Sequence, residues 1–166
     1  MEEMRKILIP IVVVLFASPL LAGSKVKVQQ PFPLFNLKRL GATARGSLSQ
    51  YRGKVVVVDF WASWCEPCKK EVPALNALYK KYARQGVVVL GVNVDDDEST
   101  AKDFVKDNPV SFPLFHDDGK KLAGQCDLST MPSSFVIDRK GVVRYIHSGY
   151  QDGDAGKFDK EVKSVL

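Results

Sequence analysis

Two cysteines separated by two residues, Cys65 and Cys68, are the clearest candidates for chemistry in this chain. They lie in the segment WASWCEPCKKEVP, residues 61–73. A pair at this spacing can be half of a metal site, a structural staple or a redox-active dithiol. The chain's other cysteine and its two histidines are Cys126, His116 and His147. None of these is paired at metal-ligand spacing, so a four-ligand zinc site is disfavoured. Both histidines fall on predicted strands, and we expect them to be structural.

Two further uses of the pair fit the sequence less well. Covalent haem attachment needs a histidine directly after the second cysteine, and Lys69 stands there. A structural disulfide gains more chain entropy from closing a longer loop than this one. A redox-active dithiol therefore fits best.

The pair lies where a predicted buried strand gives way to a predicted helix. Residues 55–60 (VVVVDF) are the continuous β-branched run that is typical of a strand buried on both faces. From Glu66 to about Arg84, apolar residues recur at helical spacing. A helix start stabilises a thiolate through its free N–H groups and partial positive charge. We therefore expect Cys65 to be the attacking thiol, and Cys68, one turn further on, to resolve a mixed disulfide.

Other side chains near the pair should adjust its chemistry. Pro67 suits a first helical turn, where its missing N–H costs little. Asp59 is a carboxyl group in an apolar strand, so burial should raise its pKa and let it accept the proton of Cys68. Glu66 lies between the cysteines and should disfavour the Cys65 thiolate, which makes the couple more reducing.

The rest of the chain alternates between strands and helices. The predicted strands are 32–37, before a turn at Gly41, then 87–94, 114–116, 134–137 and 142–147, the last two joined by a hairpin turn at 138–141. The predicted helices are one capped by Asp97 that runs to Asn108, one over 120–126, and a terminal one with Phe158, Val162 and Val165 on one face. This order implies an α/β layered domain with a mixed sheet.

Composition is that of an ordinary globular protein. The 166 residues are 45% hydrophobic and 26% charged, with a net charge of +5. That length is enough for one domain with a core of its own. No basic run is interleaved with aromatic residues, so nucleic acid is not an expected partner.

Residues 1–24 are expected to lie outside the domain, which covers residues 25–166. Arg5 and Lys6 precede an uncharged apolar run over 7–23, the pattern of an export signal. The run is slightly short for a membrane span of about 20 residues. A cleaved signal peptide and a retained single anchor both remain open, and either one places the domain outside the cytoplasm.

With these motifs the chain resembles the thioredoxin superfamily, and more closely its exported TlpA/ResA-type members. VVVVDFWASWCEPC is similar to the family's strand and active-site motif, and TMPSSFVID to the segment that carries its cis-proline. Pro73 matches a helix-kinking proline. Residues 31–61 resemble the N-terminal extension of the exported branch, and residues 95–118 its central insertion. The resemblance covers about residues 31–165.

The resemblance implies a thioredoxin fold, with a central mixed sheet flanked by helices, an N-terminal β extension and a central βα insertion. It makes Cys65 the nucleophile, Cys68 the resolving thiol, and the two a reversible disulfide. Asp59 matches the superfamily's buried acid. Glu71, on the same helix face as Cys68, matches a glutamate implicated in recognition or proton handling. Having both acids leaves the proton acceptor open between them.

The resemblance also implies a substrate surface around the disulfide. Pro132 would be the cis-proline, whose carbonyl-side backbone faces the disulfide and pairs with an extended substrate segment. Met131 is less usual at its position and is expected to alter substrate choice. Trp64 is expected to cover the disulfide, and Glu66 and Pro67 complete this surface.

The implied function is bacterial thiol–disulfide exchange with protein substrates outside the cytoplasm. We expect a monomeric reductase that needs no cofactor and takes electrons from a membrane thiol carrier. An apocytochrome c is a client suggested by resemblance alone. A disulfide-introducing oxidase and a Cu(I) metallochaperone that binds through Cys65, Cys68 and Met131 are the alternatives. A peroxiredoxin is disfavoured, because its motif wants threonine and proline where Ala62 and Val58 stand.

Cys126 is the odd cysteine. It is expected to be a small buried hydrophobic residue, and the alternative is an intermolecular or regulatory disulfide.

Overall fold

Seven strands form one mixed sheet in the part of the chain that the structure describes, residues 26–166 of a computed structural model. The predicted export segment lies outside these residues. The strands are β1 (Asn36–Arg39), β2 (Arg45–Ser47), β3 (Val55–Trp61), β4 (Val87–Asn93), β5 (Leu114–His116), β6 (Ser133–Ile137) and β7 (Val143–Ser148). The α-helices are α1 (Glu66–Tyr82), α2 (Glu98–Asp107), α3 (Lys121–Cys126) and α4 (Asp154–Ser164). Short 3₁₀ turns cover Leu48–Tyr51, Ala83–Gln85 and Asp118–Lys120.

The sheet order is β2-β1-β5-β4-β3-β6-β7, so the strand that precedes the cysteines lies deep inside the sheet. β3 runs parallel to β4 and antiparallel to β6. All seven residues of β3 are buried, as the uninterrupted apolar run predicts. The α/β fold with a mixed sheet, predicted from the element order, is confirmed.

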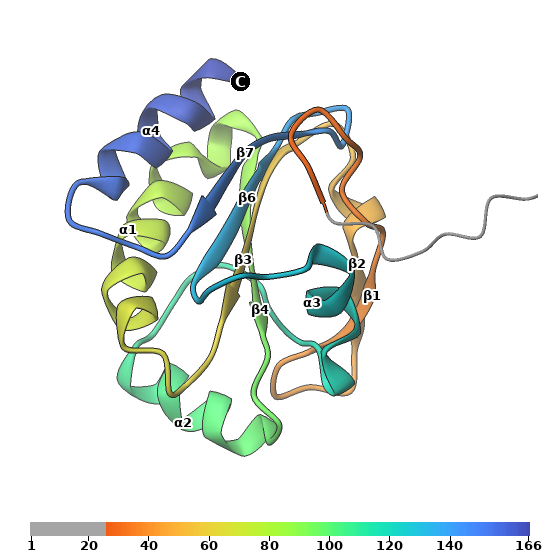
Figure 1. Cartoon of the computed structure of the whole chain (residues 1–166), viewed down its shortest axis with the longest axis vertical. Helices are drawn as coiled ribbons and strands as arrows, with labels where there is room; N and C mark the ends of the chain where they lie inside the picture. Colours follow the sequence, from red (N-terminus) through yellow and green to blue (C-terminus); the bar gives the residue numbers. More distant parts are fainter. Residues whose placement is uncertain (1–25) are drawn as a thin grey trace, which may run out of the picture.

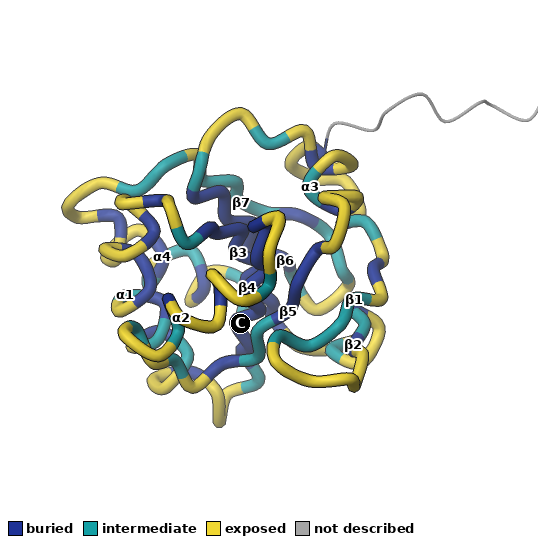
Figure 2. The backbone as a smooth tube through the Cα atoms, turned by 90° about the horizontal axis from the view of Figure 1, so that it is seen from below, coloured by how far each residue is buried: buried dark blue, intermediate teal, exposed yellow. Residues whose placement is uncertain are grey.

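Alternating residues of β3 point to two different hydrophobic layers. Val55 and Val57 pack in the layer that includes Leu75 of α1 and Phe158 of α4. The intervening valines and Phe60 pack in the other layer, with Phe32, Phe35 and Phe135. Figure 1 shows α1 and α4 side by side on one face of the sheet, with α3 on the other. Figure 2 shows the buried backbone concentrated in the central strands and the exposed backbone in the surrounding loops and helices.

The long predicted elements are confirmed with small changes at their ends. α1 buries Val72, Leu75, Leu78 and Tyr82, which recur at three- and four-residue spacing. It continues into the 3₁₀ turn, and Gly86 ends it with a φ of 88°. Asp97 caps α2 by accepting a hydrogen bond from the Ser99 amide at 2.8 Å. β6 and β7 form the predicted hairpin.

The strand predicted over residues 32–37 exists, but its predicted bounds are wrong. The strand in this region, β1, begins only at Asn36. Pro31 and Pro33 lack the amide hydrogens that a strand ladder needs, and Pro31 forms only an isolated bridge to Val142. Phe32 and Phe35 are buried in the core although neither lies in a strand. β2 was not predicted, because its three residues show no apolar alternation.

Within residues 26–166, no helix is both long and apolar enough to cross a membrane.

Candidate active site

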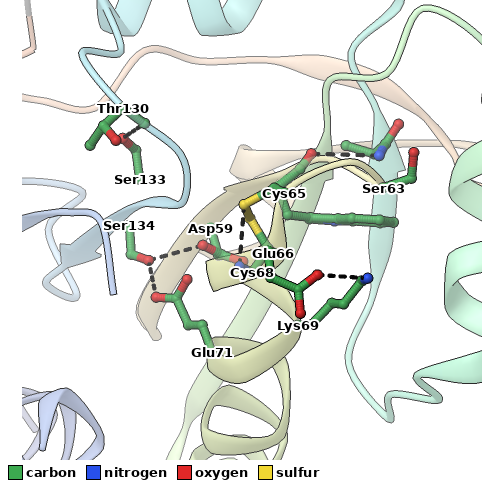
Figure 3. Close-up of a disulfide and its surroundings, with 12 residues drawn as sticks. Asp59, Ser63, Cys65, Glu66, Cys68, Lys69, Glu71, Thr130, Ser133 and Ser134 are labelled. Carbon is green, nitrogen blue, oxygen red and sulfur yellow. Dashed lines mark hydrogen bonds and ion pairs between the residues drawn. A yellow bond between two sulfur atoms is a disulfide. The ribbon is translucent and has the colours of Figure 1, made fainter. Parts of the chain in front are cut away.

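The cysteine pair sits at the junction between the central strand and α1. Cys65 is the N-cap residue of α1 and has an extended backbone conformation. Its Sγ accepts a hydrogen bond from the Cys68 amide at 3.2 Å. The two sulfur atoms are joined in a disulfide (Figure 3). After reduction, the same amide and the positive end of the helix would stabilise a thiolate on Cys65.

Both sulfur-bearing residues are shielded from solvent. Cys65 is 3% exposed and Cys68 is 1% exposed. Pro67 occupies the first turn of α1, where no intrahelical donor is lost. The chain around the disulfide is therefore packed tightly.

The end of β4 fixes the loop that carries the cysteines. The Ser63 amide donates to both carboxylate oxygens of Asp95, each at 3.1 Å. Asn93 donates to the same carboxylate at 2.9 Å, and its own side-chain oxygen lies 3.0 Å from His116 Nδ1. Sequence reasoning missed Asp95 and Asn93 as supports of the site. A polar residue at the end of a buried strand, and a carboxyl group two residues further on, were the available signal.

Two buried carboxyl groups meet beneath the helix start. Asp59 of β3 and Glu71 of α1 are each 1% exposed. Ser134 of β6 lies between them, with its Oγ 2.9 Å from Asp59 Oδ1 and 2.8 Å from Glu71 Oε1 (Figure 3). Glu71 is three residues after Cys68, on the same face of α1. The site residues predicted from sequence on these two elements are thus brought together, and Ser134 joins them.

Burial in apolar surroundings raises the pKa of both carboxyl groups. Burial raises the pKa of Glu71 to about 7, against the hydrogen bond from Ser134. Burial also raises the pKa of Asp59 well above its usual value, and the neighbouring charge of Glu71 raises it further. A carboxyl group with a raised pKa is suited to accept a proton from a thiol near neutral pH.

The residues expected to contact substrate include exposed side chains on either side of Cys65 in the sequence. Trp64 is 68% exposed, so it is not a core packing residue. Glu66 is also exposed and forms an ion pair with Lys69 at 2.8 Å, which lowers the pKa of Glu66. The Met131–Pro132 peptide bond is cis. The Pro132 carbonyl accepts a hydrogen bond from the Gly149 amide at 2.8 Å, so it already has a hydrogen-bond partner within the protein.

Burial or a side-chain contact accounts for the positions of the remaining cysteine and the two histidines. Cys126 is free and buried on α3, and burial together with the charge of Asp117 raises its pKa to about 12. His116 contacts Asn93, as described above, and His147 Nε2 lies 2.6 Å from Glu161 Oε2. Among the described residues, no group of three or more potential side-chain ligands is arranged to hold a metal ion.

Comparisons with known proteins agree with this architecture. The AhpC/TSA family matches residues 28–146. A Bacillus cereus protein named thiol-disulfide oxidoreductase ResA is 41% identical over 96 residues, which cover 58% of this chain and 56% of that protein. The Bacillus subtilis protein of the same name is 37% identical over 105 residues, covering 63% and 59%. The match therefore spans less than two thirds of the length of these curated relatives.

A solved structure covers more of the chain. It belongs to a Chlorobium tepidum protein assigned as the thiol:disulfide interchange protein DsbE, and it is 31% identical with a TM-score of 0.81. The alignment covers 84% of this chain and 98% of that one. The chain thus belongs to the AhpC/TSA family and has a thioredoxin-type fold.

Proposed function

We propose that this protein is a thiol–disulfide oxidoreductase that exchanges electrons with protein substrates through Cys65 and Cys68. The observation that carries the proposal is the disulfide at the N-terminus of α1, placed one helical turn from a buried pair of carboxyl groups. The names of the Bacillus and Chlorobium proteins support it.

The reaction in the reducing direction needs two exchanges. The Cys65 thiolate attacks a disulfide of the substrate protein, which forms a mixed disulfide and releases one substrate thiolate. Cys68 then attacks Cys65 Sγ, so the mixed disulfide breaks and the second substrate thiolate leaves. Two electrons pass from the dithiol to the substrate, and the Cys65–Cys68 disulfide is formed.

The buried carboxyl groups serve the second exchange. Cys68 must lose its thiol proton before it can attack, and at 1% exposure it has little access to water as a base. Asp59 and Glu71 form the nearby base, because at least one of them can be ionised near neutral pH. When the disulfide is reduced again, the proton returns to Cys68.

The substrate would be held beside the exposed side of the disulfide. Trp64 offers a large apolar surface there, with Glu66 and Pro67 next to it. An extended substrate segment would pair with the backbone on the Met131 side of the cis bond, because the Pro132 carbonyl is bonded to Gly149.

The direction of electron flow and the biological setting are part of the proposal. The negative charge of Glu66 beside Cys65 favours a reductase over an oxidase. The apolar run over residues 7–23 favours an extracytoplasmic location, with electrons supplied by a membrane thiol carrier. Reduction of an apocytochrome c before haem attachment is a role suggested by the TlpA/ResA resemblance.

The reduction potential of the Cys65–Cys68 couple tests this function. The protein with Cys126→Ser would be equilibrated in thiol redox buffers, and its alkylated cysteines counted by mass spectrometry. We expect a potential near or below about −250 mV, in the range of reductases. A potential near about −120 mV would contradict the reductase direction and indicate an oxidase. A pair that never forms a disulfide would contradict the oxidoreductase itself and favour Cu(I) binding.

A further inference from the structure

Ser134 has one hydroxyl proton but contacts two carboxyl groups. Its Oγ lies within 2.9 Å of an oxygen of Asp59 and within 2.8 Å of an oxygen of Glu71. A hydroxyl can donate only one hydrogen bond, although it can accept two. Ser134 can therefore donate to only one of the two acids. In the other contact, a protonated carboxyl group must donate to Ser134, because otherwise two oxygen atoms would face each other with no proton between them.

Because the three side chains are buried, water cannot take the place of this carboxyl proton. Ser134 and both acids are about 1% exposed, so bulk water cannot supply the missing hydrogen bond. Glu71 Oε2 is also buried and has no hydrogen-bond partner among the described residues. Two carboxylates facing one hydroxyl in such a site would leave a buried negative charge uncompensated. The three side chains are consistent only with a state that holds at least one carboxyl proton.

We propose that Ser134 is a positioning residue that passes a proton between Asp59 and Glu71, so that the two acids act as one acceptor for Cys68. In one state, protonated Asp59 donates to Ser134, and Ser134 donates to ionised Glu71. A shift of both protons along these two hydrogen bonds leaves Asp59 ionised, Glu71 protonated and Ser134 neutral. No charge develops on the hydroxyl group, and the ionised position moves to the acid that receives the Cys68 proton. This inference rests on the proposed function.

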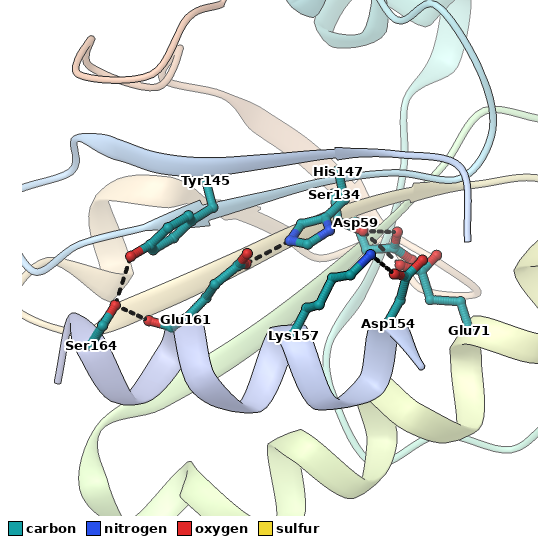
Figure 4. A network of polar contacts seen from close by, with 9 residues as sticks. All are labelled: Asp59, Glu71, Ser134, Tyr145, His147, Asp154, Lys157, Glu161 and Ser164. Atoms are coloured by element: carbon teal, nitrogen blue, oxygen red, sulfur yellow. Dashed lines mark hydrogen bonds and ion pairs between the residues drawn. The ribbon is translucent and has the colours of Figure 1, made fainter. Parts of the chain in front are cut away.

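The charged groups around the trio also bear on its titration (Figure 4). Asp154 at the start of α4 raises the pKa of Glu71, and Lys157 holds Asp154 at 2.6 Å. Burial raises the pKa of Tyr150, in the loop before α4, and the charge of Glu71 raises it further. His147 of β7 lies on the same side, where it contacts Glu161. Among the described residues, Ser134 is the side chain whose hydroxyl contacts both acids. Asp59 and Glu71 also interact directly, and this interaction contributes to the pKa shift of each.

The pH dependence of the second exchange distinguishes a proton relay from a merely structural serine. Reduced protein would be mixed with glutathione disulfide, and the conversion of the Cys65 mixed disulfide to the Cys65–Cys68 disulfide followed by acid quenching and mass spectrometry. Ser134→Ala removes the hydrogen bond that stabilises the ionised acid. We expect the midpoint of the pH–rate profile to rise by about one pH unit, the effect of one hydrogen bond to a charged group.

Two variants serve as controls. Ser134→Thr keeps the hydroxyl and should restore the wild-type midpoint. Ser133→Ala removes the neighbouring buried hydroxyl, which donates to the Thr130 carbonyl at 2.6 Å and contacts neither acid. It should leave the midpoint unchanged even where it lowers the stability.

A Ser134→Ala profile that keeps the wild-type midpoint, with only a uniformly lower rate, would overturn the relay. If this variant does not fold, ¹³C NMR titration of the two carboxyl carbons in oxidised wild-type protein decides. If the two acids are linked, the chemical shifts of both carboxyl carbons should change at both titration steps. If each carboxyl carbon instead shows a single step of its own, the inference is overturned. A wild-type protein that forms no mixed disulfide would instead contradict the proposed function, and the NMR titration would still test the link.

Discussion

Asp59 on β3 lies directly opposite Ser134 on β6 in the antiparallel pairing of the two strands. This register places the carboxyl and hydroxyl groups on the same face of the sheet, the one that packs against α1 and α4. α1 then brings Glu71 to the same hydroxyl from the helix side. A slip of either strand by one residue would turn its side chain to the other face. The polar trio is therefore specified by the strand register as much as by residue type.

Replacing Glu71 by glutamine should stabilise the folded protein above neutral pH. The pKa of Glu71 rises from the ordinary glutamate value of 4.5 to about 7, so the folded chain binds more protons than the unfolded chain between these values. The contribution of Glu71 to stability is thus greatest below pH 4.5 and is lost as the pH rises through about 7. Glu71→Gln removes the buried charge. We expect a gain on the order of 2 kcal/mol in the free energy of unfolding at pH 8, and almost none at pH 4.

Urea unfolding of the oxidised protein at the two pH values measures this difference. Glu66→Gln is the matched control, because Glu66 lies on the same helix but is exposed. Its substitution should change the stability little, and any effect should be a small loss at pH 8, the opposite sign to Glu71→Gln, because the ion pair with Lys69 lowers the pKa of Glu66. An equal effect of Glu71→Gln at pH 4 and pH 8 would show that Glu71 does not titrate as a buried acid.

Serine substitution of each active-site cysteine should give opposite results with a substrate disulfide. Cys68→Ser leaves the Cys65 thiol at the helix N-terminus but removes the resolving thiol, so a mixed disulfide should accumulate. Of the pair, Cys65→Ser leaves only Cys68, which is 1% exposed, and its reaction should be at least about tenfold slower. Mass spectrometry after incubation with glutathione disulfide counts the adducts. Accumulation in the Cys65→Ser variant instead would exchange the two assigned roles.

The long elements of the site could be predicted from the sequence because each carries a strong local pattern. The valine run of β3 and the helical spacing in α1 place the cysteines at a strand-to-helix junction without any tertiary information. The short strand β2 has no such pattern, and its neighbour β1 was placed too early because Phe32 and Phe35 look like strand residues. Their burial comes from packing beneath the sheet and not from membership in it.

The partners of the two acids could not be predicted in the same way. Ser134 is 75 residues from Asp59 and 63 from Glu71, and only the register between β3 and β6 brings it to both. Asp95 similarly reaches the Ser63 amide across 32 residues. A single polar residue in a strand or after one shows that a partner is needed, but not which residue supplies it.

The charges at the helix start should tune the redox potential in opposite directions. Glu66 disfavours a thiolate on Cys65, and Lys69, which is paired with Glu66 at 2.8 Å, partly offsets it. Glu66→Ala should therefore raise the reduction potential, by less than about 30 mV because both groups are exposed to solvent. Lys69→Ala should lower it. Equilibration in thiol redox buffers measures both variants, and an unchanged potential in Glu66→Ala would remove this argument for a reductase.

Cys126 should take no part in the redox cycle. Its pKa is raised to about 12 by burial and by the charge of Asp117, so almost no thiolate exists at pH 8. In the native oxidised protein, we expect iodoacetamide to modify Cys126 at least about 100 times more slowly than in denaturant. Cys126→Ser should leave the potential of the Cys65–Cys68 couple unchanged. Rapid alkylation of native Cys126 would favour the regulatory disulfide considered from the sequence.

Trp64 should contribute to recognition of protein substrates and not to the stability of the fold. Its side chain is 68% exposed, so Trp64→Ala should change the free energy of unfolding by no more than about 0.5 kcal/mol. Loss of an aromatic contact of this size should slow the reduction of a protein substrate such as insulin by about tenfold or more. The reduction of a small aromatic disulfide, which makes fewer contacts, should fall less.

Leu34→Ala is the matched control for this test, because Leu34 is an equally exposed large apolar side chain. It lines a cavity of about 430 Å³ beside Arg139 and the turn between β6 and β7, and neither Cys65 nor Cys68 lines this cavity. Leu34→Ala should therefore leave both reduction rates unchanged. An equal loss in the two variants would indicate that exposed apolar area in general, and not the position of Trp64 beside Cys65, determines binding. An insulin reduction rate that is unchanged in Trp64→Ala would place the substrate surface elsewhere.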